Sequence, residues 1–131
     1  MRSRSNPEVS SVARRSAERR GRAGEVLAAV YLLLKGYRIV TRRFRCRAGE
    51  IDLVAKKRNW LIFVEVKSRV SGTDIETALA GVNRARIASA AQIFLTRAEH
   101  SGRDVRIDVI FLAPGKWPHH IKNAFGEAGR A

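Results

Sequence analysis

Two carboxylates and an ammonium group stand in a part of this 131-residue chain that is otherwise apolar. Asp52 lies in the first of two apolar segments, and the pattern Glu65-Val66-Lys67 ends the second. Burying charge in such segments is costly, so these side chains indicate an ion pair or a bound metal ion. Mg²⁺ and Mn²⁺ prefer oxygen ligands, and the carbonyl of Val66 offers a third oxygen beside the two carboxylates. We therefore expect Asp52, Glu65 and Val66 to hold a divalent cation.

The residues around these groups predict a β-hairpin. Residues 51–55 and 60–68 are rich in apolar and β-branched side chains, and the polar segment 56–59 between them predicts the turn. If Ala55 pairs with Trp60, alternation along both strands gives one wholly apolar face, which a helix must cover. That face consists of Ile51, Leu53, Ala55, Trp60, Ile62, Val64 and Val66.

The opposite face of the hairpin is apolar near the turn and ionisable at the far end, where Glu50, Asp52, Glu65 and Lys67 lie. In this register Asp52 and Glu65 are diagonal neighbours whose side chains converge. The ammonium group of Lys67 on the same face can position an attacking water and stabilise negative charge. Such a set of groups is suited to metal-assisted hydrolysis of a phosphodiester. The spacing alone also fits a structural salt bridge, and Glu50 fits either a minor ligand or a solvated side chain.

Patterns elsewhere predict the elements that position the hairpin. Apolar residues at three- and four-residue spacing predict a helix from about Ser16 to Lys35, and Gly36 ends it. Alternating patterns predict further strands over residues 37–45 and 105–112.

A second long helix is expected between the last two strands. Thr73-Asp-Ile-Glu76 has the pattern of a capping box, and the helix that it opens is predicted to run to about Arg97. The order αβββαβ indicates an α/β fold with a mixed central sheet flanked by helices. Near the C-terminus, Ile121, Ala124 and Phe125 predict a short helix docked on the body.

The charge balance points to a polyanionic partner, with nucleic acid first. Lys and Arg number 26 against 12 Asp and Glu, which gives a formal net charge of +14. Residues 1–15 lack apolar periodicity and predict a disordered basic tail, followed by a single domain over residues 16–131. No apolar run reaches membrane-spanning length, no secretory signal is recognisable, and Cys46 is the single cysteine. We expect a cytoplasmic protein with no membrane partner.

Several segments together carry a resemblance to a known family. They are Gly21-Arg-Ala-Gly-Glu25, Gly36-Tyr37-Arg38-Ile39, Gly49-Glu-Ile-Asp52-Leu, Phe63-Val-Glu65-Val-Lys67, Arg106-Ile-Asp108-Val and Ile121-Lys-Asn-Ala-Phe125. In these segments the chain resembles the YraN-like family of uncharacterised bacterial proteins. That family resembles the restriction-endonuclease-like, PD-(D/E)xK, nuclease superfamily and is close to Holliday-junction resolvases in organisation. The resemblance implies an αβββαβ core, dependence on Mg²⁺ or Mn²⁺, nuclease chemistry on DNA and, by analogy with the resolvases, a homodimer.

The resemblance also assigns roles to residues. Asp52, Glu65 and Lys67 fall on the nuclease motif, and Glu25 falls on a first-helix glutamate that such nucleases aim at the metal. Two positions depart from the pattern, because Ile51 replaces the usual proline and Asn83 stands near the place of a lysine found in relatives. Without the resemblance, Glu25 is expected to serve the helix terminus.

Three further features are interpreted from the residues alone. Asp108 in its alternating strand predicts a salt bridge, and the adjacent His119 and His120 predict a loop surface. Seven arginines are candidates for phosphate contacts, with a solvated basic edge as the alternative. They are Arg42, Arg43, Arg45, Arg47, Arg69, Arg84 and Arg86.

The leading hypothesis is a Mg²⁺-dependent nuclease that hydrolyses DNA phosphodiesters, with selectivity for DNA structure left open. The alternative is a non-catalytic nucleic-acid-binding module that keeps the nuclease fold. A third is a basic adaptor that binds a protein partner through the segment ending at Phe125.

Overall fold

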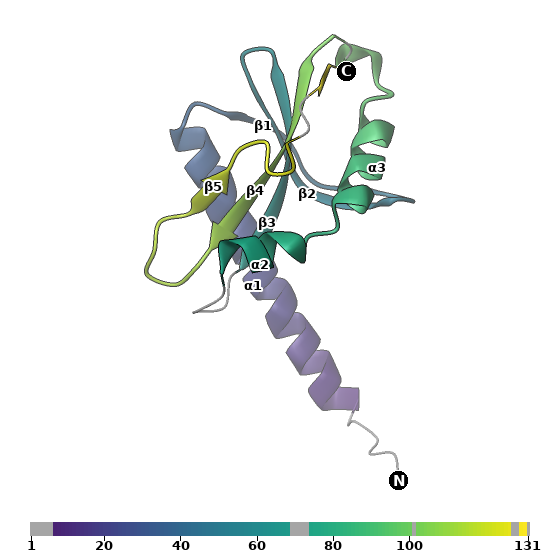
Figure 1. The fold of residues 1–131 in the computed structure, drawn as a ribbon. Coiled ribbons are helices and arrows are strands. Elements are labelled where there is room, and N and C mark those ends of the chain that lie inside the picture. The colour runs from purple at the N-terminus through teal and green to yellow at the C-terminus, as the bar shows by residue number, and fades with distance from the viewer. Residues whose placement is uncertain (1–6, 69–73, 101, 127–128, 131) are drawn as a thin grey trace.

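A mixed β-sheet with helices on both faces forms the body of the protein (Figure 1). The computed structural model describes residues 7–68, 74–100, 102–126 and 129–130. The strand order is β1-β2-β3-β4-β5, and β6 pairs with β4 beside this path. Neighbouring strands are antiparallel except for the parallel pair β3 and β4. The predicted α/β class and αβββαβ order are confirmed.

The helices are α1 (Pro7–Leu34), α2 (Ile75–Ala80), α3 (Arg84–Phe94) and the 3₁₀ turn η1 (Ala98–His100). The strands are β1 (Arg38–Cys46), β2 (Gly49–Lys57), β3 (Trp60–Ser68), β4 (Asp104–Leu112), β5 (His119–Ile121) and β6 (Gly129–Arg130). The parallel pairing of β3 and β4 requires a crossover, which α2 and α3 provide.

Helix α1 is longer than the sequence predicts. It begins at Pro7 instead of about Ser16, so residues 7–15, predicted as disordered, belong to the helix. Proline suits the first turn of a helix because its missing N–H has no intrahelical partner there. The N-terminal part of α1 extends beyond the sheet (Figure 1). In the described part of the chain, no helix is both long and apolar enough to span a membrane.

The hairpin register differs by two residues from the prediction. Lys57 pairs with Trp60, and Val54 pairs with Phe63 instead of Leu61. The strands extend further toward the turn, and only Arg58 and Asn59 lie between them. In the paired part of the hairpin, residues 53–57 and 60–64, a shift of two residues keeps each side chain on its predicted face, whereas a shift of one would reverse them.

The predicted long helix is two helices. Helix α2 ends at Ala80, and Asn83 caps α3 by accepting a hydrogen bond from the main-chain N–H of Arg86 at 3.1 Å. Glycine and asparagine favour helix ends, and the segment Gly81-Val82-Asn83 therefore interrupts the periodic pattern. The N-cap of α2 is Asp74, whose side chain accepts from the N–H of Glu76 at 3.3 Å.

The C-terminal segment docks as a strand, and the prediction of a helix there is wrong. Residues 119–121 form β5 against β4, and the N–H of Ala124 donates to the carbonyl of Ile107 at 2.9 Å. Ile121, Ala124 and Phe125 pack against the core, as expected. Pairing with the edge of β4 satisfies the backbone polar groups that a short helix would leave unpaired at its ends.

Two apolar clusters, one on each face, hold the helices to the sheet. Ala28, Ala29 and Leu32 of α1 pack in the cluster that contains Leu53, Ala55, Ile62 and Val64. Ile87, Ala90, Ala91 and Phe94 of α3 pack in the cluster that contains Val54, Leu61 and Phe63. Helices α1 and α3 thus each cover one face of the sheet, and the packing of α1 places Glu25 beside the sheet.

Candidate metal centre

The side-chain alternation of β2 breaks at Asp52. Leu53 belongs to the cluster under α1, whereas Ile51, two residues away, belongs to the cluster under α3. The prediction that Ile51 shares the face of Leu53 is therefore wrong. The irregularity extends to the neighbouring strand β1. There Arg43 has a left-handed backbone with φ of 54°, and it lies between the pairs Arg42–Leu53 and Phe44–Ile51. A left-handed arginine is strained, and such strain is often found at functional sites.

Asp52 lies where β2 separates from β3. The last ladder pair is Leu53 with Val64, and beyond it the main-chain N–H of Val66 donates to Oδ2 of Asp52 at 2.8 Å. The Asp52 side chain thus replaces a strand carbonyl as the acceptor. This hydrogen bond fixes the carboxylate beside Glu65.

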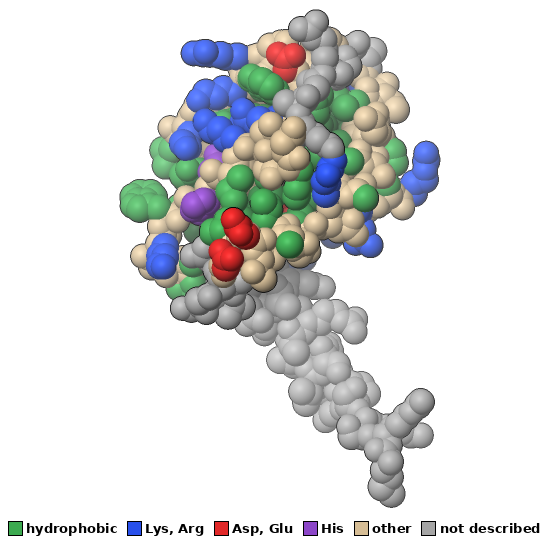
Figure 2. Space-filling model, in the orientation of Figure 1, with side chains coloured by type: hydrophobic (Ala, Val, Ile, Leu, Met, Phe, Trp, Pro, Cys, Tyr) green, Lys and Arg blue, Asp and Glu red, His purple; other side chains and the backbone are tan. Residues whose placement is uncertain are grey.

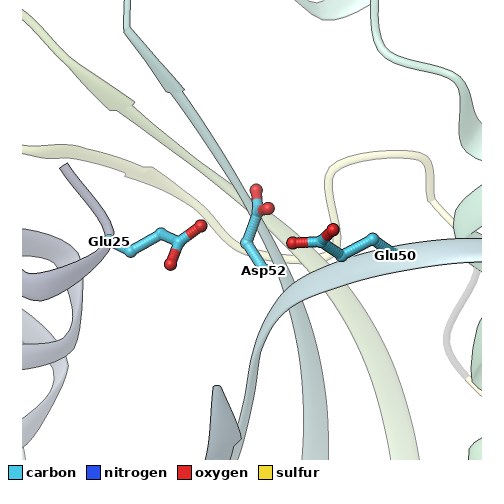
Figure 3. A group of neighbouring side chains, drawn as sticks. All are labelled: Glu25, Glu50 and Asp52. Atoms are coloured by element: carbon cyan, nitrogen blue, oxygen red, sulfur yellow. The ribbon is translucent and has the colours of Figure 1, made fainter. Parts of the chain in front are cut away.

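Three carboxylates converge at this point. One oxygen from each of Glu25, Glu50 and Asp52 lies within 4.8 Å of the others. Figure 3 shows Glu25 reaching from α1 and Glu50 from β2, with Asp52 between them. Glu25 is buried, with 6% of its surface exposed, Asp52 is half-buried, and the Glu50 side chain is 38% exposed. Oxygens this close and this shielded repel one another unless cations compensate them.

Cationic side chains contact three of the acidic groups. Nε of Arg43 lies 2.6 Å from Oε2 of Glu25, and Nε of Arg45 lies 3.2 Å from Oε2 of Glu50. Nζ of Lys67 lies 3.4 Å from Oε1 of Glu65. The contacts described for the Asp52 side chain are the N–H of Val66 and the carboxyl group of Glu65, neither of which is a cation.

Two carboxyl groups at the centre, those of Asp52 and Glu65, have raised pKa values. Burial raises the pKa of Asp52 to about 7, and the charge of Glu65 adds to this rise against the hydrogen bond from Val66. Burial also raises the pKa of Glu65, while the charge of Lys67 opposes the rise. A divalent cation would reverse both effects by favouring the ionised forms.

The donor set fits a hard divalent cation. It consists of carboxylate oxygens without thiol or imidazole, which favours Mg²⁺ or Mn²⁺ over zinc. The raised pKa of Asp52 comes first from burial and second from the charge of Glu65, and a bound cation would oppose both causes. Glu25, Glu50 and Asp52 are therefore the residues that would hold the ion.

The structure brings Glu25, Asp52, Glu65 and Lys67 together, although the metal-ligand group differs from the predicted set. Glu50 joins the group, and its signal in the sequence was its position two residues before Asp52 on the same strand face. The contact described for Val66 at this centre is its N–H to Asp52, and a ligand role for its carbonyl stays a prediction.

The predicted phosphate-contacting arginines occupy different settings. Arg42 and Arg47 are exposed, while Arg43 and Arg45 contact glutamates of the centre. Exposed Arg84 and Arg86 begin α3, and the Arg86 side chain packs against Gly49 beside Glu50. Arg69 lies outside the described residues.

Asp108 belongs to a separate buried network, and the predicted salt bridge is present. Arg106 donates to both of its carboxylate oxygens, at 2.7 and 2.9 Å, and the N–H of Asn123 donates at 3.0 Å. Nε2 of His120 lies 2.6 Å from Oδ2 of Asp108. The His120 side chain is 2% exposed, so its prediction as loop surface is wrong, whereas His119 is exposed. His120 is buried because β5 pairs with β4 and brings it beside Asp108.

The fold and this site define an α/β protein with an acidic centre between its first helix and its second strand. The chain belongs to the uncharacterised protein family UPF0102, whose model matches residues 24–112. This membership confirms the resemblance to the YraN-like family.

Similar UPF0102 proteins cover nearly the whole chain. The protein from Mesorhizobium japonicum is 46% identical over 119 residues, 90% of this chain and 95% of the relative. The protein from Agrobacterium fabrum is 46% identical over 113 residues, 86% and 93% of the two chains. One from Rhodopseudomonas palustris is 45% identical over 120 residues, 91% and 89% of the two chains. These names state no activity, so function is argued from the site.

Proposed function

We propose that the protein is a Mg²⁺-dependent nuclease that hydrolyses DNA phosphodiesters. The observation that carries the proposal is the convergence of Glu25, Glu50 and Asp52 within 4.8 Å, beside the pair of Glu65 and Lys67. Carboxylates placed to hold a divalent cation, next to an ammonium group, are suited to metal-assisted hydrolysis of a phosphodiester. Mn²⁺ has similar ligand preferences and would replace Mg²⁺.

Each side chain has a role that follows from its contacts. Asp52, fixed by Val66, and the buried Glu25 hold the ion with Glu50. When bound, the ion supplies charge neutralisation for the phosphoryl oxygens. Lys67, whose side chain is 46% exposed, can reach a substrate and orient the attacking water while its contact with Glu65 limits its motion.

DNA as the substrate is supported by charge. The formal net charge of +14 favours a polyanion, and exposed Arg42 and Arg47 flank the acidic centre along the chain. Arg43 and Arg45 are adjacent to the same centre through Glu25 and Glu50. Arginines beside the ion would position a phosphate backbone independently of base sequence.

The test is cleavage of labelled branched, single-stranded and duplex DNA in Mg²⁺ or Mn²⁺. The wild type is compared with Asp52→Ala, with Lys67→Ala and with Lys116→Ala, an exposed lysine outside the centre. We expect the first two substitutions to abolish or strongly reduce cleavage and the third to leave it intact. Cleavage that survives both Asp52→Ala and Lys67→Ala would contradict the proposal.

A non-catalytic DNA-binding module is the second candidate. The ion pairs of Glu25 with Arg43 and of Glu50 with Arg45 favour it, because internal arginines already neutralise part of the charge that a metal would neutralise. This candidate predicts DNA binding without Mg²⁺ binding. Absence of cleavage for all three DNA forms, with undiminished affinity in a chelator, would support it over the nuclease.

A further inference from the structure

A strongly basic pocket lies at the other end of the sheet from the acidic centre. Its volume is about 260 Å³, and it is lined by Gly36, Arg38, Lys56, Lys57, Arg58 and Arg103. Five of these six residues are cationic, and the sixth has no side chain. Figure 2 shows Lys and Arg side chains gathered at the upper edge of the molecule, where Figure 1 places the β2–β3 hairpin.

Two of the lining cations oppose each other directly. Arg38 of β1 and Lys56 of β2 are partners in the antiparallel register. Like charges in this arrangement destabilise a sheet, because their side chains leave the same face within a few ångströms. Within the described residues, no carboxylate forms an ion pair with Arg38, Lys56 or Arg58. In the part of the chain that the structure describes, no carboxylate therefore offsets the repulsion between these cations through an ion pair.

Arg58 adds a second, independent cost. It occupies the first position of the two-residue turn between Lys57 and Trp60, with φ of 55°. Glycine or asparagine suits a left-handed residue in such a turn, because the Cβ atom of other residues crowds the backbone there. The chain instead places an arginine there, at the rim of the pocket.

Two other cations are held in place by the backbone and shape the pocket wall. Nζ of Lys57 donates to the carbonyl of Lys35 at 2.8 Å and lies 4.9 Å from the centre of the Tyr37 ring. Nη1 of Arg103 donates to the carbonyl of Arg58 at 3.5 Å. Arg38, Lys56 and Arg58 are then the cations that remain for a ligand.

We propose that this pocket binds phosphate groups of a nucleic-acid backbone. The lining offers guanidinium and ammonium groups but no aromatic or apolar side chain for a base, so the recognised chemistry is the phosphate alone. Lys57 lies five residues along β2 from Asp52, roughly 17 Å at the usual rise of a strand. That span corresponds to about five base-pair steps along the axis of a duplex. The pocket is thus a second contact with the phosphate backbone of the nucleic acid. This inference rests on the proposed function only for the class of partner.

The experiment measures affinity for a fluorescent DNA duplex of about two helical turns, by anisotropy in a chelator and over a range of salt. The pocket variant carries Arg38→Gln and Lys56→Gln, and the matched control carries Arg22→Gln and Lys116→Gln, two exposed cations that do not line the pocket. Loss of two phosphate contacts should reduce the fall in affinity between about 50 and about 200 mM salt by roughly tenfold. The control should keep the wild-type salt dependence. Equal effects in both variants would refute a specific pocket.

A second measurement identifies the source of the phosphate. Amide NMR shifts of Gly36 and Arg58 are followed on adding either the duplex or inorganic tripolyphosphate. The proposal is supported if the duplex shifts these amide signals in the wild type and does not shift them in the pocket variant. Shifts with tripolyphosphate but not with the duplex would assign the pocket to a free polyphosphate and overturn it, as would no shift with either.

This inference and the nuclease proposal can fail separately. Asp52→Ala should remove cleavage and leave the Gly36 and Arg58 shifts unchanged. Because Arg38→Gln removes a like-charge contact, the pocket variant should unfold at the wild-type temperature or higher, which confirms that it is folded.

Discussion

The main-chain N–H of Val66 donates to Oδ2 of Asp52 at 2.8 Å, beyond the last ladder pair of β2 and β3. One carboxylate therefore links β2 to β3 at the end of the hairpin far from the turn, and the same carboxylate belongs to the candidate metal centre. The two roles make different demands. A hydrogen-bond acceptor of any charge serves the first, whereas the second requires ionisation.

Replacing Asp52 should separate these roles in the metal-free protein. The folded-state pKa of Asp52 is raised to about 7, so its stabilising contribution is present at acid pH and is lost as the pH rises through about 7. We expect Asp52→Asn, which keeps an acceptor for Val66, to be more stable than the wild type at about pH 8 by about 2 kcal/mol. That figure is roughly half of what the full rise of the pKa gives, because solvent screens part of the interaction.

Urea unfolding in a chelator at about pH 5 and about pH 8 measures this effect. Asp52→Ala is the matched variant, because it leaves the N–H of Val66 without its acceptor and should be about 1–3 kcal/mol less stable than Asp52→Asn. A wild type as stable as Asp52→Asn at both pH values would contradict the raised pKa.

Metal affinity should depend on pH through the two carboxyl groups with raised pKa values, Asp52 and Glu65. Protonated carboxyl groups are poor ligands, so Mg²⁺ or Mn²⁺ should bind more tightly as the pH rises from about 6 to about 8. Calorimetric titration gives both the affinity and the number of protons released. Glu25→Gln and Glu50→Gln should weaken binding, while Glu76→Gln, at an exposed glutamate of α2, should not. Identical titrations for all three variants would exclude this centre as the metal site.

Lys67 should affect the rate of cleavage more than the binding of metal. Its ammonium group contacts Glu65 at 3.4 Å but supplies no ligand oxygen. We expect Lys67→Ala to lower kcat about 10²- to 10³-fold, because a group that stabilises developing negative charge is lost. Metal affinity should be unchanged or higher. Lys67→Arg keeps the positive charge and should restore part of the rate, and full activity in Lys67→Ala would remove Lys67 from the mechanism.

Asp108 should be a stability residue and not a catalytic one. Burial raises its pKa, but hydrogen bonds from His120, Arg106 and the N–H of Asn123 outweigh burial and bring the pKa below the usual value. Its stabilising contribution is therefore present at neutral pH and lost as the pH falls through the acid range. Asp108→Ala leaves Arg106 without its buried partner and should cost about 3–5 kcal/mol.

Thermal and urea unfolding measure this cost, with Glu99→Gln as a control because that side chain is 70% exposed. Mg²⁺ affinity, measured where Asp108→Ala is still folded, should equal that of the wild type. A variant that keeps its stability and loses metal binding would place Asp108 in the functional site instead.

Residue patterns predicted the strands well and the breaks between helices poorly. Trp60–Ser68 matches its predicted range because the strand begins with a run of apolar side chains, several of them β-branched or aromatic, which favours a buried strand. The predicted helix from 73 to 97 is divided because Gly81 and the capping Asn83 act locally, against an apolar periodicity that continues through them. The short β5 could not be predicted, since its pairing partner, β4, determines its conformation.

For the centre itself, the sequence alone determined which residue types were available and on which strand faces they lay. Asp52 and Glu65 both lie far from the turn in their strands, so a two-residue error in the register of the hairpin still kept them at one end of the sheet, although the alternation of β2 breaks at Asp52. Only the tertiary structure decided that Glu25 meets Glu50 and Asp52, and that Arg43 is turned toward Glu25. The physical reason is that these contacts depend on the packing of α1 over the sheet and on a strained backbone at Arg43. The apolar spacing of α1 predicts the helix but not its position over the sheet, and no pattern in the sequence predicts the left-handed backbone of Arg43.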